Sequence, residues 1–128
     1  MASQPRSAAR RLSIAALALS FCLPVSVSAL AADANRSAYD MARKCLVADG
    51  HASAERNRAG DTAKAAHYDA MARQAFDVAF NAGEKLGLSD DQVKRDLDFT
   101  QQMELPRFIR EPDYLRSTAA TCKAVGLM

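Results

Sequence analysis

The chain has 128 residues, of which 17 are lysine or arginine and 15 are aspartate or glutamate. This near balance argues against a protein that binds nucleic acid through a clustered basic surface. Only 6% of the residues are aromatic and none is tryptophan, so any helices must pack closely through small side chains. The length is enough for one domain and too short for two.

Residues 1–31 have the pattern of a cleavable secretory signal peptide. Three arginines precede the apolar run LSIAALALSFCLPVSV, and the small residues Ala29 and Ala31 follow it. This order of basic, apolar and small-residue segments is typical of an export signal, and the run is shorter than the roughly 20 residues of a membrane helix. An uncleaved N-terminal anchor is the alternative. We therefore predict no stable membrane anchor and a single helical domain over residues 32–128.

The leader contains Cys22, which raises the question of lipidation. Lipid modification needs a small residue directly before the cysteine, and Phe21 stands there, so the leader has no lipobox. Removing the three arginines of the leader leaves 14 basic and 15 acidic side chains, a formal charge of −1. We therefore expect a near-neutral periplasmic or secreted protein.

The cysteines that remain after export are Cys45 and Cys122. An even pair in an oxidising compartment is typical of a disulfide. Two free buried thiols or an intermolecular bond are the alternatives. We predict the intramolecular bridge, which in the chain-entropy view stabilises a loop of this length by roughly 4–5 kcal/mol.

Residues 34–126 show helical periodicity and almost no strand signal. The first helix is predicted from about Asn35 into the fifties. A second helix is predicted to begin at Asp61 or Thr62, either of which can cap its free N–H groups. Its apolar residues follow heptad-like spacing, which predicts a buried stripe. This stripe consists of Tyr68, Met71, Ala72, Ala75, Phe76, Ala79 and Gly83.

The third helix is predicted to start with a capping box between Ser89 and Gln92 and to end at Pro106, which lacks an N–H. Its predicted inner face consists of Val93, Leu97, Thr100 and Met103. Pro112 suits the first position of a last helix that stops before Gly126. The inner stripe of this helix is predicted to contain Leu115, Thr118, Ala119, Cys122 and Val125.

The segment LPRFIREP is predicted to connect the third and last helices, and the longer stretch LPRFIREPDYLR combines apolar and basic residues. Aromatic residues and arginine often anchor protein interfaces because they offer large contact areas and directed polar groups. The alternative is that the apolar residues fix a connector to the bundle while the arginines stay hydrated. The candidate partner-binding residues are Leu105, Arg107, Phe108, Ile109, Arg110 and Tyr114.

A metal or ligand site is the second candidate for function. His67 and Met71 are four residues apart, and a soft metal such as copper(I) accepts both side chains. His51 is the other histidine of the sequence. The sequence has no C-x-x-C-H motif for covalent haem and no H-E-x-x-H motif for zinc. A weak metal site at His51, His67 and Met71 therefore remains an alternative to structural or surface roles.

These patterns together predict an all-α four-helix bundle of about 95 residues with one disulfide. The sequence contains no G-x-S-x-G motif and no other catalytic pattern, so we do not expect an enzyme. We expect an exported protein-interaction domain that needs no cofactor, such as an inhibitor, an immunity-type neutraliser or a chaperone-like factor. The alternative is a helical bundle that binds a small ligand or a metal, for example haem or copper.

Overall fold

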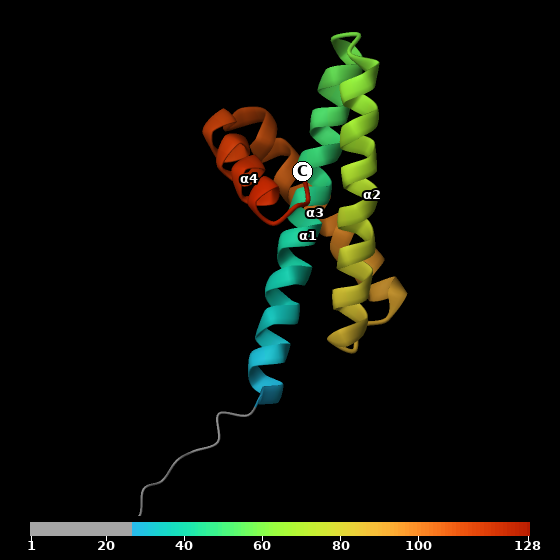
Figure 1. The fold of residues 1–128 in the computed structure, drawn as a ribbon, viewed down its shortest axis with the longest axis vertical. Coiled ribbons are helices and arrows are strands. Elements are labelled where there is room, and N and C mark those ends of the chain that lie inside the picture. The colour runs from blue at the N-terminus through green and yellow to red at the C-terminus, as the bar shows by residue number, and fades with distance from the viewer. Residues whose placement is uncertain (1–26) are drawn as a thin grey trace, which may run out of the picture.

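The computed structural model describes residues 27–128 as four α-helices (Figure 1). No strand occurs in this range, which confirms the predicted all-α class. The helices are α1 (Val27–Arg58), α2 (Thr62–Lys85), α3 (Asp90–Arg110) and α4 (Pro112–Ala124). The basic start and most of the apolar run of the predicted leader, with Cys22, lie outside the described residues. The cleavage site therefore stays a prediction.

Helices α1 and α2 form a long antiparallel hairpin, and its tip projects beyond α3 and α4 (Figure 1). Asp61 caps α2 as predicted, because its carboxylate accepts a hydrogen bond of 3.1 Å from the Lys64 N–H. The start of α1 was predicted too late, since the helix begins at Val27. Alanine has the highest helix propensity, and the alanine-rich stretch before Asn35 continues the helix although its residues are exposed.

Helix α3 has the predicted capping box. The Gln92 N–H donates to the Ser89 hydroxyl and the Ser89 N–H donates to the Gln92 side chain. The predicted end at Pro106 is wrong, because α3 continues to Arg110. Pro106 and Gln102 are both exposed, so water can bind the carbonyl that Pro106 leaves without an N–H. The last turn is also held by Phe108, which is buried.

Helix α4 follows α3 after a single residue, Glu111, so most of the predicted connector, residues 105–110, is in fact helical and belongs to the end of α3. Pro112 occupies the first turn of α4 as predicted. The helix ends at Ala124, and Gly126 then adopts a positive φ of 74°, a backbone conformation that favours glycine.

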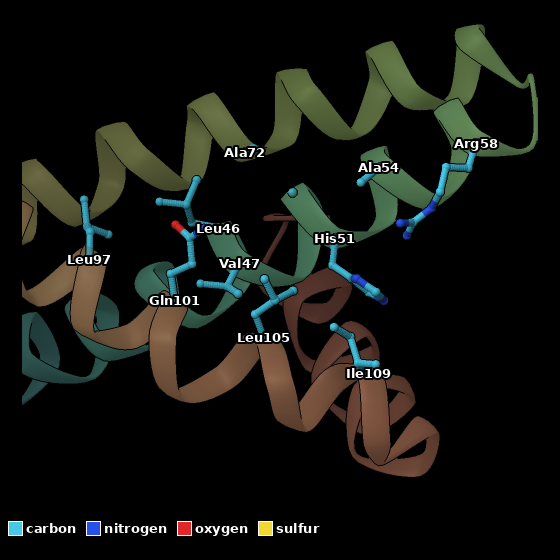
Figure 2. Close-up of a pocket in the computed structure, with 11 residues that line it drawn as sticks. Leu46, Val47, His51, Ala54, Arg58, Ala72, Leu97, Gln101, Leu105 and Ile109 are labelled. Atoms are coloured by element: carbon cyan, nitrogen blue, oxygen red, sulfur yellow. The ribbon is translucent and has the colours of Figure 1, made fainter.

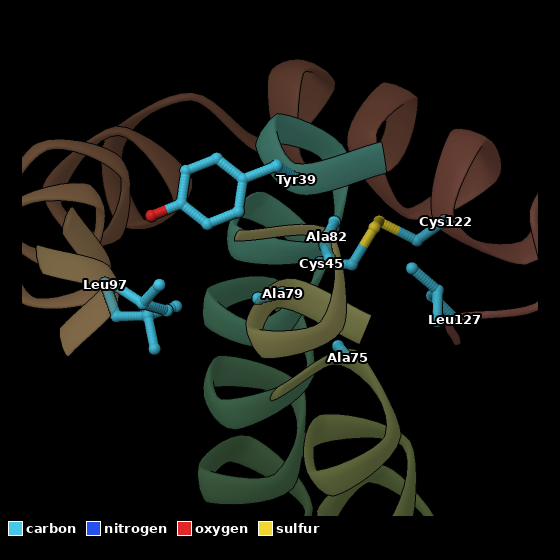
Figure 3. Packing of buried hydrophobic residues seen from close by; sticks show 10 residues of the cluster. Tyr39, Cys45, Ala75, Ala79, Ala82, Leu97, Cys122 and Leu127 are labelled. Atoms are coloured by element: carbon cyan, nitrogen blue, oxygen red, sulfur yellow. A yellow bond between two sulfur atoms is a disulfide. The ribbon is translucent and has the colours of Figure 1, made fainter. Parts of the chain in front are cut away.

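The core is built mainly from small side chains where α1 and α2 meet, and α3 and α4 cover it (Figure 3). The Cys45–Cys122 disulfide joins α1 to α4 as predicted, and both cysteines are fully buried. Figure 3 shows Leu127 beside this bridge. The buried cluster consists of Tyr39, Ala42, Cys45, Ala75, Ala79, Ala82, Val93, Leu97, Cys122 and Leu127.

A polar network attaches α3 to α1. The Tyr39 hydroxyl donates a hydrogen bond of 2.7 Å to the Asp96 carboxylate. The Arg43 guanidinium lies over the Tyr39 ring, 4.5 Å from its centroid, and donates to the Thr100 hydroxyl at 3.1 Å. Burial and the bond to Asp96 raise the pKa of Tyr39 to about 12. The network fixes which face of α3 turns toward the core.

Three residues expected on inner faces are partly exposed: Phe76 (41%), Met103 (54%) and Val125 (53%). For Met103 the reason is geometric, because each helical residue advances by about 100° and Met103 falls well round from Val93 and Leu97. Phe76 lies against Phe80 with ring centroids 4.5 Å apart, so the two rings shield each other in part. Val125 follows the end of α4 and is therefore not on its inner stripe.

Candidate functional site: an apolar cleft beside His51

An open cleft of about 450 Å³ lies between α1 and α3, with Ala72 of α2 also in its lining (Figure 2). Small-molecule sites in proteins measure about 300–1,000 Å³ and are mostly apolar. The cleft is lined by Leu46, Val47, Gly50, His51, Ala54, Arg58, Ala72, Leu97, Gln101, Leu105 and Ile109.

The wall from α3 is a stripe of side chains four residues apart, Leu97, Gln101, Leu105 and Ile109. Residues at this spacing lie one above another on a helix. Leu97 is buried at the inner end, whereas Ile109 is 63% exposed at the outer end. The wall that α3 supplies therefore runs from the buried Leu97 to the exposed Ile109, and Figure 2 shows these side chains along the helix.

The wall from α1 supplies the charged and imidazole groups of the cleft. His51 and Arg58 project from α1 on the side of Ile109 (Figure 2). The Arg58 guanidinium contacts the Glu55 carboxylate, which is one helical turn away. Glu55 lines an adjoining hollow of about 490 Å³ and not the cleft itself. Between the two helices, none of the described residues that line the cleft is acidic.

Gly50 gives α1 its open wall. A Cβ atom added at Gly50 would meet no atom within 4 Å, although the residue lies within a continuous helix. The sequence alone does not reveal the place of this glycine in the cleft. No sequence signal could have found it, because the partner wall comes from residues about 50 positions later in the chain.

The predicted partner-binding strip is divided among different environments. Phe108 is 2% exposed and packs with Val47 and Ala48, so it belongs to the core. The Arg107 guanidinium lies 3.7 Å from the centroid of the Tyr114 ring. The other strip members are Leu105 and Ile109, which line the cleft, and the exposed Arg110.

The Tyr114 side chain is held at both its ring and its hydroxyl. The hydroxyl donates a hydrogen bond of 2.8 Å to the Glu104 carboxylate. Arg107, which covers the ring, also lies 3.5 Å from the Glu111 carboxylate. Through these contacts Arg107 and Tyr114 hold α4 against α3, so both side chains stabilise the fold.

Of the three weak metal candidates, one lies in the cleft. His51 lines the cleft, but His67 and Met71 do not. The His67 ring instead lies edge-on to Tyr68 at 5.5 Å. Among residues 27–128, no group of three or more His, Cys, Asp or Glu side chains is placed to hold a metal ion.

Asp49 is a buried carboxyl group on α1. It is fully buried, and neither carboxylate oxygen has a hydrogen-bond partner among the described residues. Burial raises the pKa of Asp49 to about 7, because the charged form loses its water. Asp49 does not line the cleft, so its burial bears on the pH dependence of the fold and not on that site.

No protein-family model matches this sequence, and no curated protein or solved structure is detectably similar to it. None of the helices within residues 27–128 is both long and apolar enough to span a membrane. The buried disulfide is typical of proteins from oxidising compartments. Geometry alone must therefore suggest the function.

Proposed function

We propose that this protein is an exported, non-enzymatic interaction domain that binds a partner protein through the outward face of α3. The predicted leader and the disulfide support export, because disulfides persist outside the reducing cytosol. The polar side chains of the cleft are His51, Arg58 and Gln101, which supply no nucleophile paired with a base. This set favours binding over covalent catalysis.

The observation that carries the proposal is a row of exposed residues on α3, here named the outer stripe: Phe99, Met103, Pro106 and Arg110. Phe99 is 62% exposed and Met103 is 54% exposed. The spacing of four, three and four residues places all members on one helix face. This face lies away from the buried residues Val93 and Leu97. Large apolar side chains in a row on the surface are typical of interaction sites.

The charge around the outer stripe indicates what a partner must offer. Arg110 is part of the stripe, and Arg95 lies one turn before Phe99 and is also exposed. Arginine and aromatic residues are over-represented at the centres of protein interfaces. We therefore expect the partner to present an apolar patch with acidic residues at its rim.

Helix α3 is well suited to present such a surface because it is held rigidly. Its N-terminal half is fixed by the Tyr39–Asp96 bond, and its C-terminal half is fixed by Phe108 and the Tyr114–Glu104 bond. A surface that is already ordered loses less conformational entropy on binding. The outer stripe is therefore preorganised.

Photo-crosslinking in the native cell tests this proposal. A photoreactive benzoyl-phenylalanine in place of Met103 should give one discrete adduct with a partner protein. The same group in place of Ala66, an exposed residue of α2, is the control and should not give that adduct. Adding Phe99→Ser and Arg110→Glu should remove most of the adduct while the melting temperature stays within a few degrees, because both side chains are exposed.

Two results would contradict the proposal. One is an adduct that forms equally from position 66. The other is an adduct from position 103 that survives the two added substitutions. An adduct with twice the mass of the chain would show that the partner is a second copy of this protein and not a different protein.

A second candidate function is the binding of a small ligand, and the cleft beside His51 favours it. Its volume and its apolar lining match those of ordinary ligand sites. The cleft and the outer stripe occupy different faces of α3, so one function can be tested without disturbing the other.

A further inference from the structure

We infer that the cleft beside His51 binds a single-chain anionic amphiphile, such as a fatty acid with its carboxylate against Arg58. This inference rests on the second candidate function and names its ligand class. It draws on three features of the cleft: the glycine in its wall, the sign of its charged groups, and the separation of its apolar and polar ends.

The glycine at position 50 is the first feature. A glycine within a helix costs roughly 0.5–1 kcal/mol compared with alanine. Packing does not explain this cost, since an added Cβ would meet no atom within 4 Å. The conformation does not explain it either, because Gly50 has no positive φ. What Gly50 provides is space in the wall of the cleft.

Gly83 shows what a glycine required by packing looks like in the same protein. A Cβ atom there would lie 2.6 Å from a methyl carbon of Val93 and 3.3 Å from the Tyr39 ring. Gly83 is therefore needed so that α2 can approach α1 and α3. Gly50 faces open space instead, and this contrast points to a cavity that is kept open.

The charge of the lining is the second feature. Arg58 is its one fully charged side chain, and His51 adds a nitrogen that can donate a hydrogen bond. Arg58 contacts Glu55, but a guanidinium has five N–H donors and can bind a second anion. A cationic ligand would meet Arg58 without an acidic residue in the lining to balance it. The cleft therefore favours an anionic head group.

The third feature is the separation of polar and apolar groups along the cleft. Leu46, Leu97 and Leu105 lie at the end away from Arg58, where the uncharged Gln101 is the one polar side chain of the lining (Figure 2). An alkyl chain placed among them would bury apolar surface, which contributes roughly 0.8 kcal/mol for each methylene. A ligand with a carboxylate at one end and a single chain at the other matches this arrangement.

Calorimetric titration with dodecanoate tests the inference on the purified mature protein. Dodecyltrimethylammonium, which has the same chain with a positive head group, is the matched ligand control. We expect dodecanoate to bind at least about tenfold more tightly than the cationic surfactant. Equal binding of the two ligands, or tighter binding of the cationic one, would overturn the inference.

Two substitutions at Gly50 then locate the site. Gly50→Ala should raise the melting temperature through better helix propensity and leave most dodecanoate binding intact. Gly50→Leu should be equally well folded, because the space for its side chain exists, but it should weaken dodecanoate binding at least about tenfold by filling the cleft. Unchanged binding by a folded Gly50→Leu variant would show that the ligand sits elsewhere.

Replacing the charged group completes the test. Arg58→Gln should weaken dodecanoate binding about tenfold, whereas Arg56→Gln, at an exposed residue outside the cleft, should not. Vesicles of anionic phospholipid should not retain the protein, since we expect it to bind a free amphiphile; retention that Gly50→Leu abolishes would assign the site to membrane lipid instead. Gly50→Leu should not change the crosslinking from position 103. Failure of the ligand-binding proposal can therefore be recognised separately from failure of the partner-binding proposal.

Discussion

Asp49 shows how a single residue can set the pH dependence of this fold. Its carboxyl group is fully buried and has no hydrogen-bond partner among the described residues. A buried carboxylate without a partner is costly, so burial favours the protonated form and raises the pKa of Asp49 to about 7. In the unfolded chain an aspartate has a pKa of about 3.9. The two states therefore bind different numbers of protons between about pH 4 and pH 7.

The sign of the effect follows from this difference. Between these pH values the folded state holds a proton that the unfolded state has lost, so the free energy of unfolding falls as the pH rises. With a shift of about three pKa units, the loss is at most about 4 kcal/mol and is complete above pH 7. Asp49 thus favours the fold most in acid and least at neutral pH.

We predict that Asp49→Asn removes this pH dependence. The amide cannot ionise, so the variant should be more stable than the native protein at pH 7 and should lose that advantage toward pH 4. Urea unfolding of both proteins at several pH values gives the difference between their free energies of unfolding. Contributions from other titrating groups cancel in this difference. A difference that stays constant from pH 4 to pH 8 would contradict this account of Asp49.

The sequence could place Asp49 but could not describe its environment. Spacings of three and four residues place Asp49 on the same face of α1 as Ala42 and Cys45, and all three are buried. Whether a partner reaches its oxygens depends on the surrounding helices, which lie far away in the sequence. The same limit applies to Gly50, whose open space is visible only when α3 is in place.

At the scale of the helices, Gly83 controls how closely α2 approaches its neighbours. Its missing side chain makes room for Val93 from α3 and Tyr39 from α1. Val93 is β-branched and nearly fully buried, so it has few alternative rotamers. The three helices therefore meet at a point where one methyl group decides the fit.

We predict that Gly83→Ala destabilises the protein although alanine is the better helix former. Overpacking of a core costs about 1–3 kcal/mol, which exceeds the gain of roughly 1 kcal/mol in propensity. In a Val93→Ala background the same substitution should be neutral or stabilising, because the methyl at 2.6 Å is gone. Chemical unfolding of the four proteins of this cycle gives the coupling energy, and strictly additive effects would contradict the clash.

The helices themselves were largely predictable, because their signals are local. The capping box at Ser89 and Gln92 and the aspartate cap at Asp61 occur where the sequence indicates them. The end of α3 was missed because proline normally stops a helix. The packing of Phe108 against Val47 and Ala48 outweighs that local preference. This packing depends on residues that are distant in the sequence.

At the scale of the whole molecule, one covalent bond links its first and last helices. The Cys45–Cys122 bridge closes a segment that contains all of α2 and α3. The pairing could be predicted by elimination, since these two cysteines remain once the leader is removed. The cleft and the outer stripe could not be predicted, because both depend on how α3 crosses the hairpin.

We predict that the double variant Cys45→Ala/Cys122→Ala loses roughly 4–5 kcal/mol of unfolding free energy, since its unfolded chain regains the freedom of a long loop. Small domains have about 5–15 kcal/mol in total, so the variant should be marginally stable. Equilibrium unfolding in urea measures the loss, and the native protein with a reductant during unfolding is the control. A loss below about 1 kcal/mol would show that packing alone holds α4 in place.

The single-residue joint at Glu111 has an evolutionary consequence. Because α4 starts directly after it, an inserted amino acid that lengthened α3 by one helical residue would turn every later residue by about 100° and shift it by about 1.5 Å. Cys122 would then face away from Cys45, whose Cα atom is now 5.6 Å from its own. Natural homologues should accordingly tolerate indels in the α1–α2 turn around Gly60 and almost never between α3 and α4.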